Sequence, residues 1–125
     1  MSEKKERLED IKIENNIWLL YLVIIGLSYI SNEFEKKYFL YNDQKAKEIY
    51  RIMTIIIFAT VAVVYFYFAN DAIENVKNLK PWDSKQKVTL TNLNALASSL
   101  ILIAGLIFIY IAIVDTDLNV EIAFN

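Results

Sequence analysis

Three long runs of uncharged, mostly apolar residues alternate with charged segments along the chain. Residues 15–32, 52–70 and 88–114 contain no Asp, Glu, Lys or Arg, and they are 18, 19 and 27 residues long. A helix of about 20 apolar residues crosses the hydrocarbon core of a bilayer. The pattern therefore predicts an all-α integral membrane protein with three transmembrane helices in a small bundle.

The charged flanks set the expected boundaries of a single membrane domain over residues 1–125. Asp43 stands ahead of good helix formers and predicts the N-cap of the second helix, and Asp83 or Ser84 predicts that of the third. Pro81 ends the second helix, so helices 2 and 3 are expected to extend beyond the bilayer. The expected elements are an amphipathic N-terminal helix (1–14), a first span (15–32), a second span (50–70) whose helix continues to about residue 80, a third span (90–114) and an acidic tail (115–125).

Basic residues are distributed unequally between the two sides of this arrangement. The N-terminal segment and the loop between the second and third spans carry eight Lys and Arg, whereas the first loop and the tail carry five. Because Lys and Arg accumulate in cytoplasmic loops, the N-terminus is expected in the cytoplasm and the C-terminus outside. The heavy use of Ile, Lys and Asn is typical of AT-rich genomes, so we expect a prokaryotic or phage-encoded protein of the inner or plasma membrane.

Side chains that carry out chemistry are scarce. Cysteine and histidine are both missing from the chain, which removes thiolate nucleophiles, the commonest general base and the commonest transition-metal ligand. The three runs also lack the charged groups that proton carriers and voltage sensors place in the membrane. We therefore expect no catalytic residue, no cofactor, no metal site and no enzyme activity, with Asp115 and Asp117 solvated in the tail. A net charge of −2 offers no attraction to nucleic acid.

Small residues recur at heptad spacing along the third run. One stripe, with alternating steps of four and three, consists of Thr91, Ala95, Ser98, Leu102, Gly105, Ile109 and Ala112. Such steps are typical of left-handed, coiled-coil-like packing, and small residues let helix backbones approach closely in lipid. The stripe predicts a helix-packing seam, whose partner helix lies either in the same chain or in another copy.

Two other groups of residues are candidates for function. Thr91, Asn94 and Ser98 would form rings of hydroxyl and amide groups if several copies enclosed a pore. The far end of the second helix is amphipathic, which predicts a face for a protein partner or for lipid headgroups. The residues of that face are Ile73, Val76, Leu79 and Trp82.

These patterns predict a small non-enzymatic membrane protein that acts through helix–helix association, as a self-assembling oligomer or as an accessory or scaffold subunit of a membrane complex. Its expected partners are the lipid bilayer and either itself or a larger membrane protein. The size and three-span plan resemble those of class I phage holins, in architecture alone. That resemblance implies the alternative function, an oligomeric pore or membrane-permeabilising protein of the holin or defence-effector type. The acidic tail departs from the basic C-terminal tail of that family.

Overall fold

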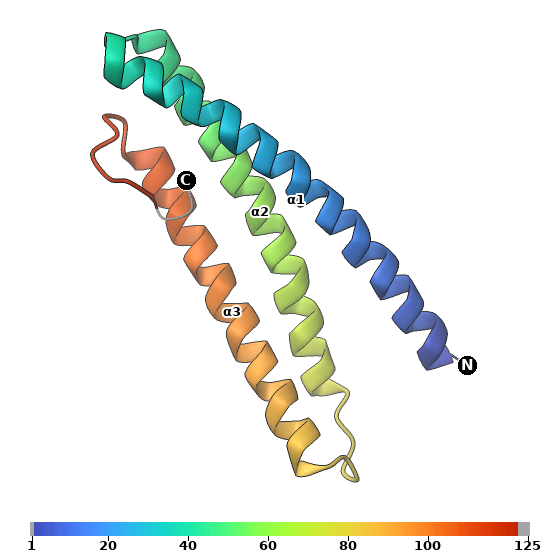
Figure 1. Ribbon diagram of the computed structural model, residues 1–125. Helices are drawn as coiled ribbons and strands as arrows, with labels where there is room; N and C mark the ends of the chain where they lie inside the picture. The colour runs from blue at the N-terminus through green and yellow to red at the C-terminus, as the bar shows by residue number, and fades with distance from the viewer. Residues whose placement is uncertain (1, 123–125) are drawn as a thin grey trace. The chain divides into compact units, whose positions relative to one another are not determined.

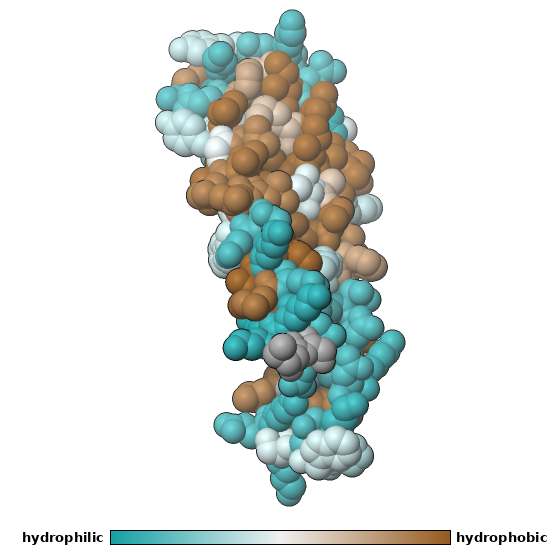
Figure 2. All heavy atoms as spheres, turned by 90° about the vertical axis from the view of Figure 1, so that its right-hand side faces the viewer, coloured by the Kyte–Doolittle hydropathy of each residue, from teal (hydrophilic) through white to brown (hydrophobic). Residues whose placement is uncertain are grey.

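The computed structural model describes residues 2–122, and this part of the chain forms three α-helices joined by turns (Figure 1). The helices are α1 (Ser2–Tyr41), α2 (Gln44–Lys77) and α3 (Lys85–Val114). Each is long and apolar enough to cross a membrane. The all-helical fold expected from the three apolar runs is therefore confirmed. On the face drawn in Figure 2, many hydrophobic residues are exposed at the surface.

Helix α1 is longer than the expected first span, because it continues without a break to Tyr41. No glycine or proline lies between Gly26 and Asn42 to interrupt it. The chain turns at Asn42, whose φ of 53° lies in the left-handed region that asparagine tolerates. Asp43 then caps α2 as expected, since its Oδ1 accepts hydrogen bonds from the N–H groups of Lys45 at 3.1 Å and Ala46 at 3.2 Å.

Helix α2 ends at Lys77, slightly before the expected end near residue 80. The next two residues continue the helical hydrogen bonding, from Asn78 N–H to the Glu74 carbonyl at 3.0 Å and from Leu79 N–H to the Val76 carbonyl at 3.2 Å. The second of these bonds spans three residues instead of four, so the chain tightens as it leaves the helix. Ser84 is the N-cap of α3, and its side chain accepts a hydrogen bond from Lys87 N–H at 3.1 Å.

The helices belong to two compact units, which divide inside α2 between Ile57 and Phe58. The first unit contains α1 and the beginning of α2. The second unit contains the rest of α2, together with α3 and the tail. Each unit is thus a helical hairpin, and α2 contributes one arm to both.

In the first unit, the less exposed side of α1 is a stripe of residues from Ile17 to Tyr38 that are alternately four and three positions apart. The ammonium of Lys47 on α2 lies 5.1 Å from the ring centroid of Tyr38, the last member of this stripe. The α2 arm of the unit buries Ala46, Tyr50, Thr54 and Ile57. Steps of four and three on α1 are those of coiled-coil packing. The stripe consists of Ile17, Tyr21, Ile24, Ser28, Ser31, Glu35 and Tyr38.

Candidate functional site

The seam expected on α3 lies on the less exposed side of that helix. Gly105 and Ala112 are buried, and the other five seam residues are half-buried. Large apolar residues between them, including Leu96, Leu100 and Ile103, are exposed. The structure thus brings all seven seam residues to one side of α3: Thr91, Ala95, Ser98, Leu102, Gly105, Ile109 and Ala112.

Tyr65 of α2 covers the seam at Gly105. A methyl group added at Gly105 would lie 3.0 Å from Tyr65 Cδ2 and 3.4 Å from Cε2. Glycine is therefore the residue that lets the ring lie flush against the α3 backbone, as small residues do where helices pack closely in lipid. At this position, the partner helix that the sequence left open belongs to the same chain.

Helix α2 presents a matching heptad stripe in the second unit. A second aromatic contact joins the two helices, because the rings of Phe58 and Phe108 lie 5.7 Å apart between centroids at an angle of 31°. Alanine occupies three positions of the α2 stripe, so both helices offer small residues along their buried sides. The members of the α2 stripe, all buried or half-buried, are Phe58, Ala62, Tyr65, Ala69, Ala72, Val76 and Leu79.

The Tyr65–Gly105 contact fixes the register of the hairpin. Helices α2 and α3 run antiparallel in this unit (Figure 1). A residue that follows Tyr65 by a given number of positions on α2 therefore lies at the same height along the hairpin as the residue that precedes Gly105 by that number on α3. One heptad toward the loop brings Ala72 level with Ser98, and two heptads bring Leu79 level with Thr91. One heptad in the other direction brings Phe58 level with Ala112. Tyr65 of α2 therefore lies against a buried small residue of α3, and the Phe58 ring contacts Phe108, one helical turn before the other buried small residue, Ala112.

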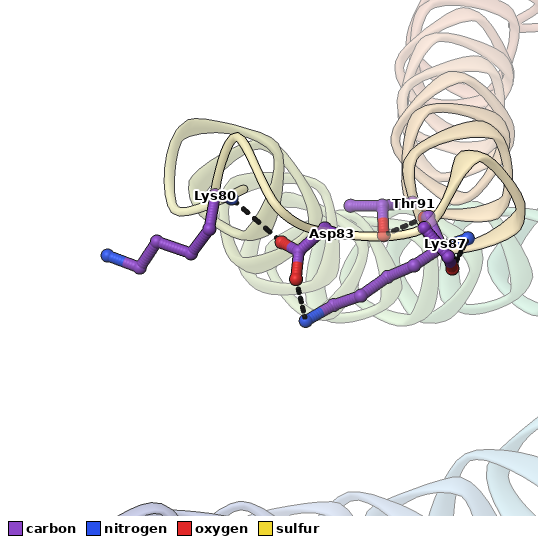
Figure 3. A network of polar contacts seen from close by, with 5 residues as sticks. Lys80, Asp83, Lys87 and Thr91 are labelled. Carbon is purple, nitrogen blue, oxygen red and sulfur yellow. Dashed lines mark hydrogen bonds and ion pairs between the residues drawn. The ribbon is translucent and has the colours of Figure 1, made fainter.

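The residues expected to line a pore differ in their exposure. The Thr91 hydroxyl donates a hydrogen bond to the Lys87 carbonyl at 2.7 Å (Figure 3). Ser98 is half-buried on the seam, whereas Asn94, which lies between Thr91 and Ser98 along the same side of α3, is exposed. Thr91 and Ser98 therefore belong to the hairpin contact, and Asn94 alone is open to the surroundings.

The expected partner or headgroup face at the end of α2 is divided in the same way. Val76 and Leu79 are half-buried and belong to the stripe that pairs with α3. Ile73 is exposed, and Trp82 in the following loop is 80% exposed. The sequence predicts one amphipathic face made of all four residues. The structure gives two of them to the hairpin and leaves Ile73 and Trp82 accessible.

Asp115 organises the start of the tail, a role that the sequence did not suggest. Its backbone N–H caps α3 by donating to the Ile111 carbonyl at 2.9 Å. Its carboxylate accepts hydrogen bonds from the N–H groups of Asn119 at 2.9 Å and Val120 at 2.8 Å. The chain closes this loop through Leu118, whose φ is 55°, a conformation that bulky residues rarely adopt. A carboxylate directly after the last apolar residue was the available signal, but its partners are backbone groups that the sequence does not reveal.

The fold and the seam define a class, namely all-helical proteins whose helices are long and apolar enough to cross a membrane. Among the described residues, no cluster of three or more His, Cys, Asp or Glu could hold a metal ion. Comparisons with protein-family models, curated proteins and solved structures find no match for this chain.

Proposed function

We propose that this protein is an integral membrane protein that acts through helix–helix association, as a self-assembling oligomer or as an accessory subunit of a membrane complex. Three helices of sufficient length and apolarity support the membrane setting. So do the many large apolar side chains on the surface, such as Leu22 on α1, Val63 on α2 and Ile107 on α3, because burial in lipid removes them from water.

The contrast between the two glycines of the chain carries the proposal for association. Gly105 is covered by Tyr65, whereas a methyl group added at Gly26 would meet no described atom of another part of the chain within 4 Å. Glycine inside a helix costs about 1 kcal/mol relative to alanine, and at Gly105 close packing offsets that cost. At Gly26 the offset would come from a helix outside the chain, docked on the exposed side of α1.

A leucine at Gly26 is therefore expected to reduce assembly without disturbing the fold. In mild detergent or lipid nanodiscs, native mass spectrometry of the wild type should give a multiple of the 14.6 kDa chain or a complex with a second protein. Gly26→Leu should shift the protein toward the single chain, because a large side chain holds helix backbones apart. Helix content and thermal stability should stay unchanged, since the added atoms enter open space.

Two variants provide the controls for this experiment. Gly26→Ala keeps a small residue at the contact and should assemble like the wild type. Ile25→Phe enlarges an exposed side chain that lies about 100° around α1 from Gly26, and it should also leave assembly intact. A wild-type protein that runs as a single chain in native-like lipid would contradict the proposal, and so would a Gly26→Leu variant that keeps its assembly mass.

The proposed topology places the N-terminus in the cytoplasm and the C-terminus outside. The chain has no cysteine, so a single introduced thiol reports its own side of the membrane. Asn119 is exposed, and Asn119→Cys should react with a membrane-impermeant maleimide in intact cells. Labelling that appears only after lysis would reverse the topology.

The alternative, a pore or membrane-permeabilising protein, is distinguished by an electrical measurement. An assembled pore would discharge an ion gradient across liposomes that contain the protein. Association alone would leave the gradient intact. Because Thr91 and Ser98 lie on the seam in the second unit, the association proposal is the one that the geometry favours.

A further inference from the structure

The loop between α2 and α3 contains a closed four-residue turn. Asp83 N–H donates a hydrogen bond to the Lys80 carbonyl at 3.1 Å, as the last residue of a β-turn does to the first. Lys80 N–H in return donates to Asp83 Oδ2 at 2.7 Å. Pro81 occupies the second position, where its fixed φ favours a turn. The loop is therefore held by two opposed hydrogen bonds, and Figure 3 draws the one from Lys80 N–H to the Asp83 carboxylate.

The carboxylate of Asp83 is the centre of this turn. Its second oxygen, Oδ1, forms an ion pair with the Lys87 ammonium at 3.3 Å, and only 10% of the Asp83 side chain is exposed. The hydrogen bond from Lys80 N–H, followed by the interaction with Lys87, lowers the pKa of Asp83. The group is consequently ionised at neutral pH, and the turn links the end of α2 to the first turn of α3.

Trp82 lies at the apex of the turn with 80% of its surface exposed, the highest exposure among the large hydrophobic residues described. A large aromatic ring in water is unfavourable unless something covers it. The indole combines an apolar body with an N–H donor, a combination that places tryptophan at the interface between hydrocarbon and headgroups. With α2 and α3 inserted as proposed, the loop lies beyond the second apolar run, which ends at Asn70, and thus outside the hydrocarbon core, on the side of the headgroups.

Positive charge surrounds the exposed ring. Residues 77–87 contain four lysines and one acid, Asp83, whose charge is engaged within the turn. The side chains of Lys77, Lys80 and Lys85 are exposed. Lysines that lie next to a membrane helix are attracted to the negative surface of anionic lipids. The positive charge of the lysines and the interface preference of the tryptophan ring therefore both favour contact with the headgroups of anionic lipids.

We propose that the 80–83 turn and its flanking lysines form a docking surface for the headgroups of anionic phospholipids, with the Trp82 ring inserted among them. The lysines bind the lipid phosphates, and the closed turn keeps the ring directed into the headgroup layer. This inference rests on the proposed membrane insertion of α2 and α3, and it goes beyond helix–helix association by naming a lipid class and its contact residues.

The test uses the full chain with Trp18→Phe, which leaves Trp82 as the single tryptophan. The protein is reconstituted into phosphatidylcholine vesicles that contain phosphatidylglycerol, with one of the two lipids brominated near the headgroup end of its acyl chains. Bromine quenches tryptophan on contact. Trp82 should emit at short wavelength and be quenched several-fold more strongly when phosphatidylglycerol carries the bromine than when phosphatidylcholine carries it at the same mole fraction.

Charge variants assign the preference to the loop. The triple variant Lys77→Gln/Lys80→Gln/Lys85→Gln should lose the preference for phosphatidylglycerol, because each lysine near the surface contributes about fivefold in affinity. The matched control Lys4→Gln/Lys5→Gln/Lys12→Gln removes the same charge from α1 and should keep the preference.

Two results would overturn the inference. A protein that resists carbonate extraction but shows equal quenching by the two lipids is inserted without lipid selectivity, so only the lipid docking fails. A protein that carbonate removes from the vesicles is not inserted, in which case the membrane proposal and this inference fall together.

Discussion

Gly105→Leu is expected to destabilise the α2–α3 hairpin by about 2 kcal/mol. Even the first carbon of a new side chain would lie 3.0 Å from the Tyr65 ring, and a leucine adds three more carbons in the same space. Overpacking of this kind costs about 1–3 kcal/mol or more. The higher helix propensity of leucine recovers less than about 1 kcal/mol of that cost. The net change should be visible as earlier unfolding in a titration with a denaturing detergent.

Cross-linking measures the local effect at the seam itself. Ala72 and Ser98 are level with each other, one heptad from the Tyr65–Gly105 contact. In a chain without native cysteine, Ala72→Cys/Ser98→Cys should form a disulfide readily on oxidation. The same pair should react several-fold more slowly when Gly105 is replaced by leucine, because the two backbones are forced apart. Equal cross-linking rates with and without the leucine would show that the seam tolerates a large residue.

A double-mutant cycle identifies Tyr65 as the cause. Tyr65→Ala removes the ring that a leucine at position 105 would meet, so the leucine should cost much less in that background than in the wild type. Gly105→Ala provides the graded control. Its methyl group requires the Tyr65 ring to move by a few tenths of an ångström, and the gain in helix propensity offsets that strain. Its stability should stay close to that of the wild type.

The ends and the less exposed side of the third helix could be predicted from the sequence, because its charged and its small residues are unevenly distributed. Charged residues end its apolar run on both sides, and small residues are concentrated at heptad positions within it. Periodicity of this kind identifies a buried side even where all other positions are apolar. It does not identify the partner, because close approach requires a second surface. That surface is the Tyr65 ring of α2, which lies against Gly105 in the folded hairpin.

The first helix was harder to predict, for a physical reason. In a span that faces lipid, the exposed and buried sides are equally apolar, so hydropathy carries no directional signal. The buried stripe of α1 differs from its exposed side mainly by Ser28, Ser31 and Glu35, a polar pattern that resembles the end of a span. Charged residues after Ser31 predicted a loop there, but these residues are good helix formers and the helix continues to Tyr41.

Thr54→Val is expected to stabilise the first unit by about 1 kcal/mol. Thr54 is only 4% exposed, and its hydroxyl oxygen is a buried polar atom without a hydrogen-bond partner among the described residues. An unsatisfied buried polar group costs about 1–3 kcal/mol. Valine has nearly the same shape and no polar atom, so it removes the cost and keeps the packing. Unfolding of the variant by a denaturing detergent should occur at a higher detergent fraction than unfolding of the wild type.

Ser31 provides the contrast that makes this prediction specific to an unpaired hydroxyl. Ser31 lies one heptad before Tyr38 on α1, and Thr54 lies one heptad after Lys47 on α2, whose ammonium contacts the Tyr38 ring. Ser31 is fully buried, but its hydroxyl donates to the Ser28 carbonyl at 2.9 Å. Ser31→Ala should therefore destabilise slightly, opposite in sign to Thr54→Val. A Thr54→Val variant that also destabilises would contradict the prediction and would indicate that the threonine hydroxyl has a partner outside the chain, such as a water molecule.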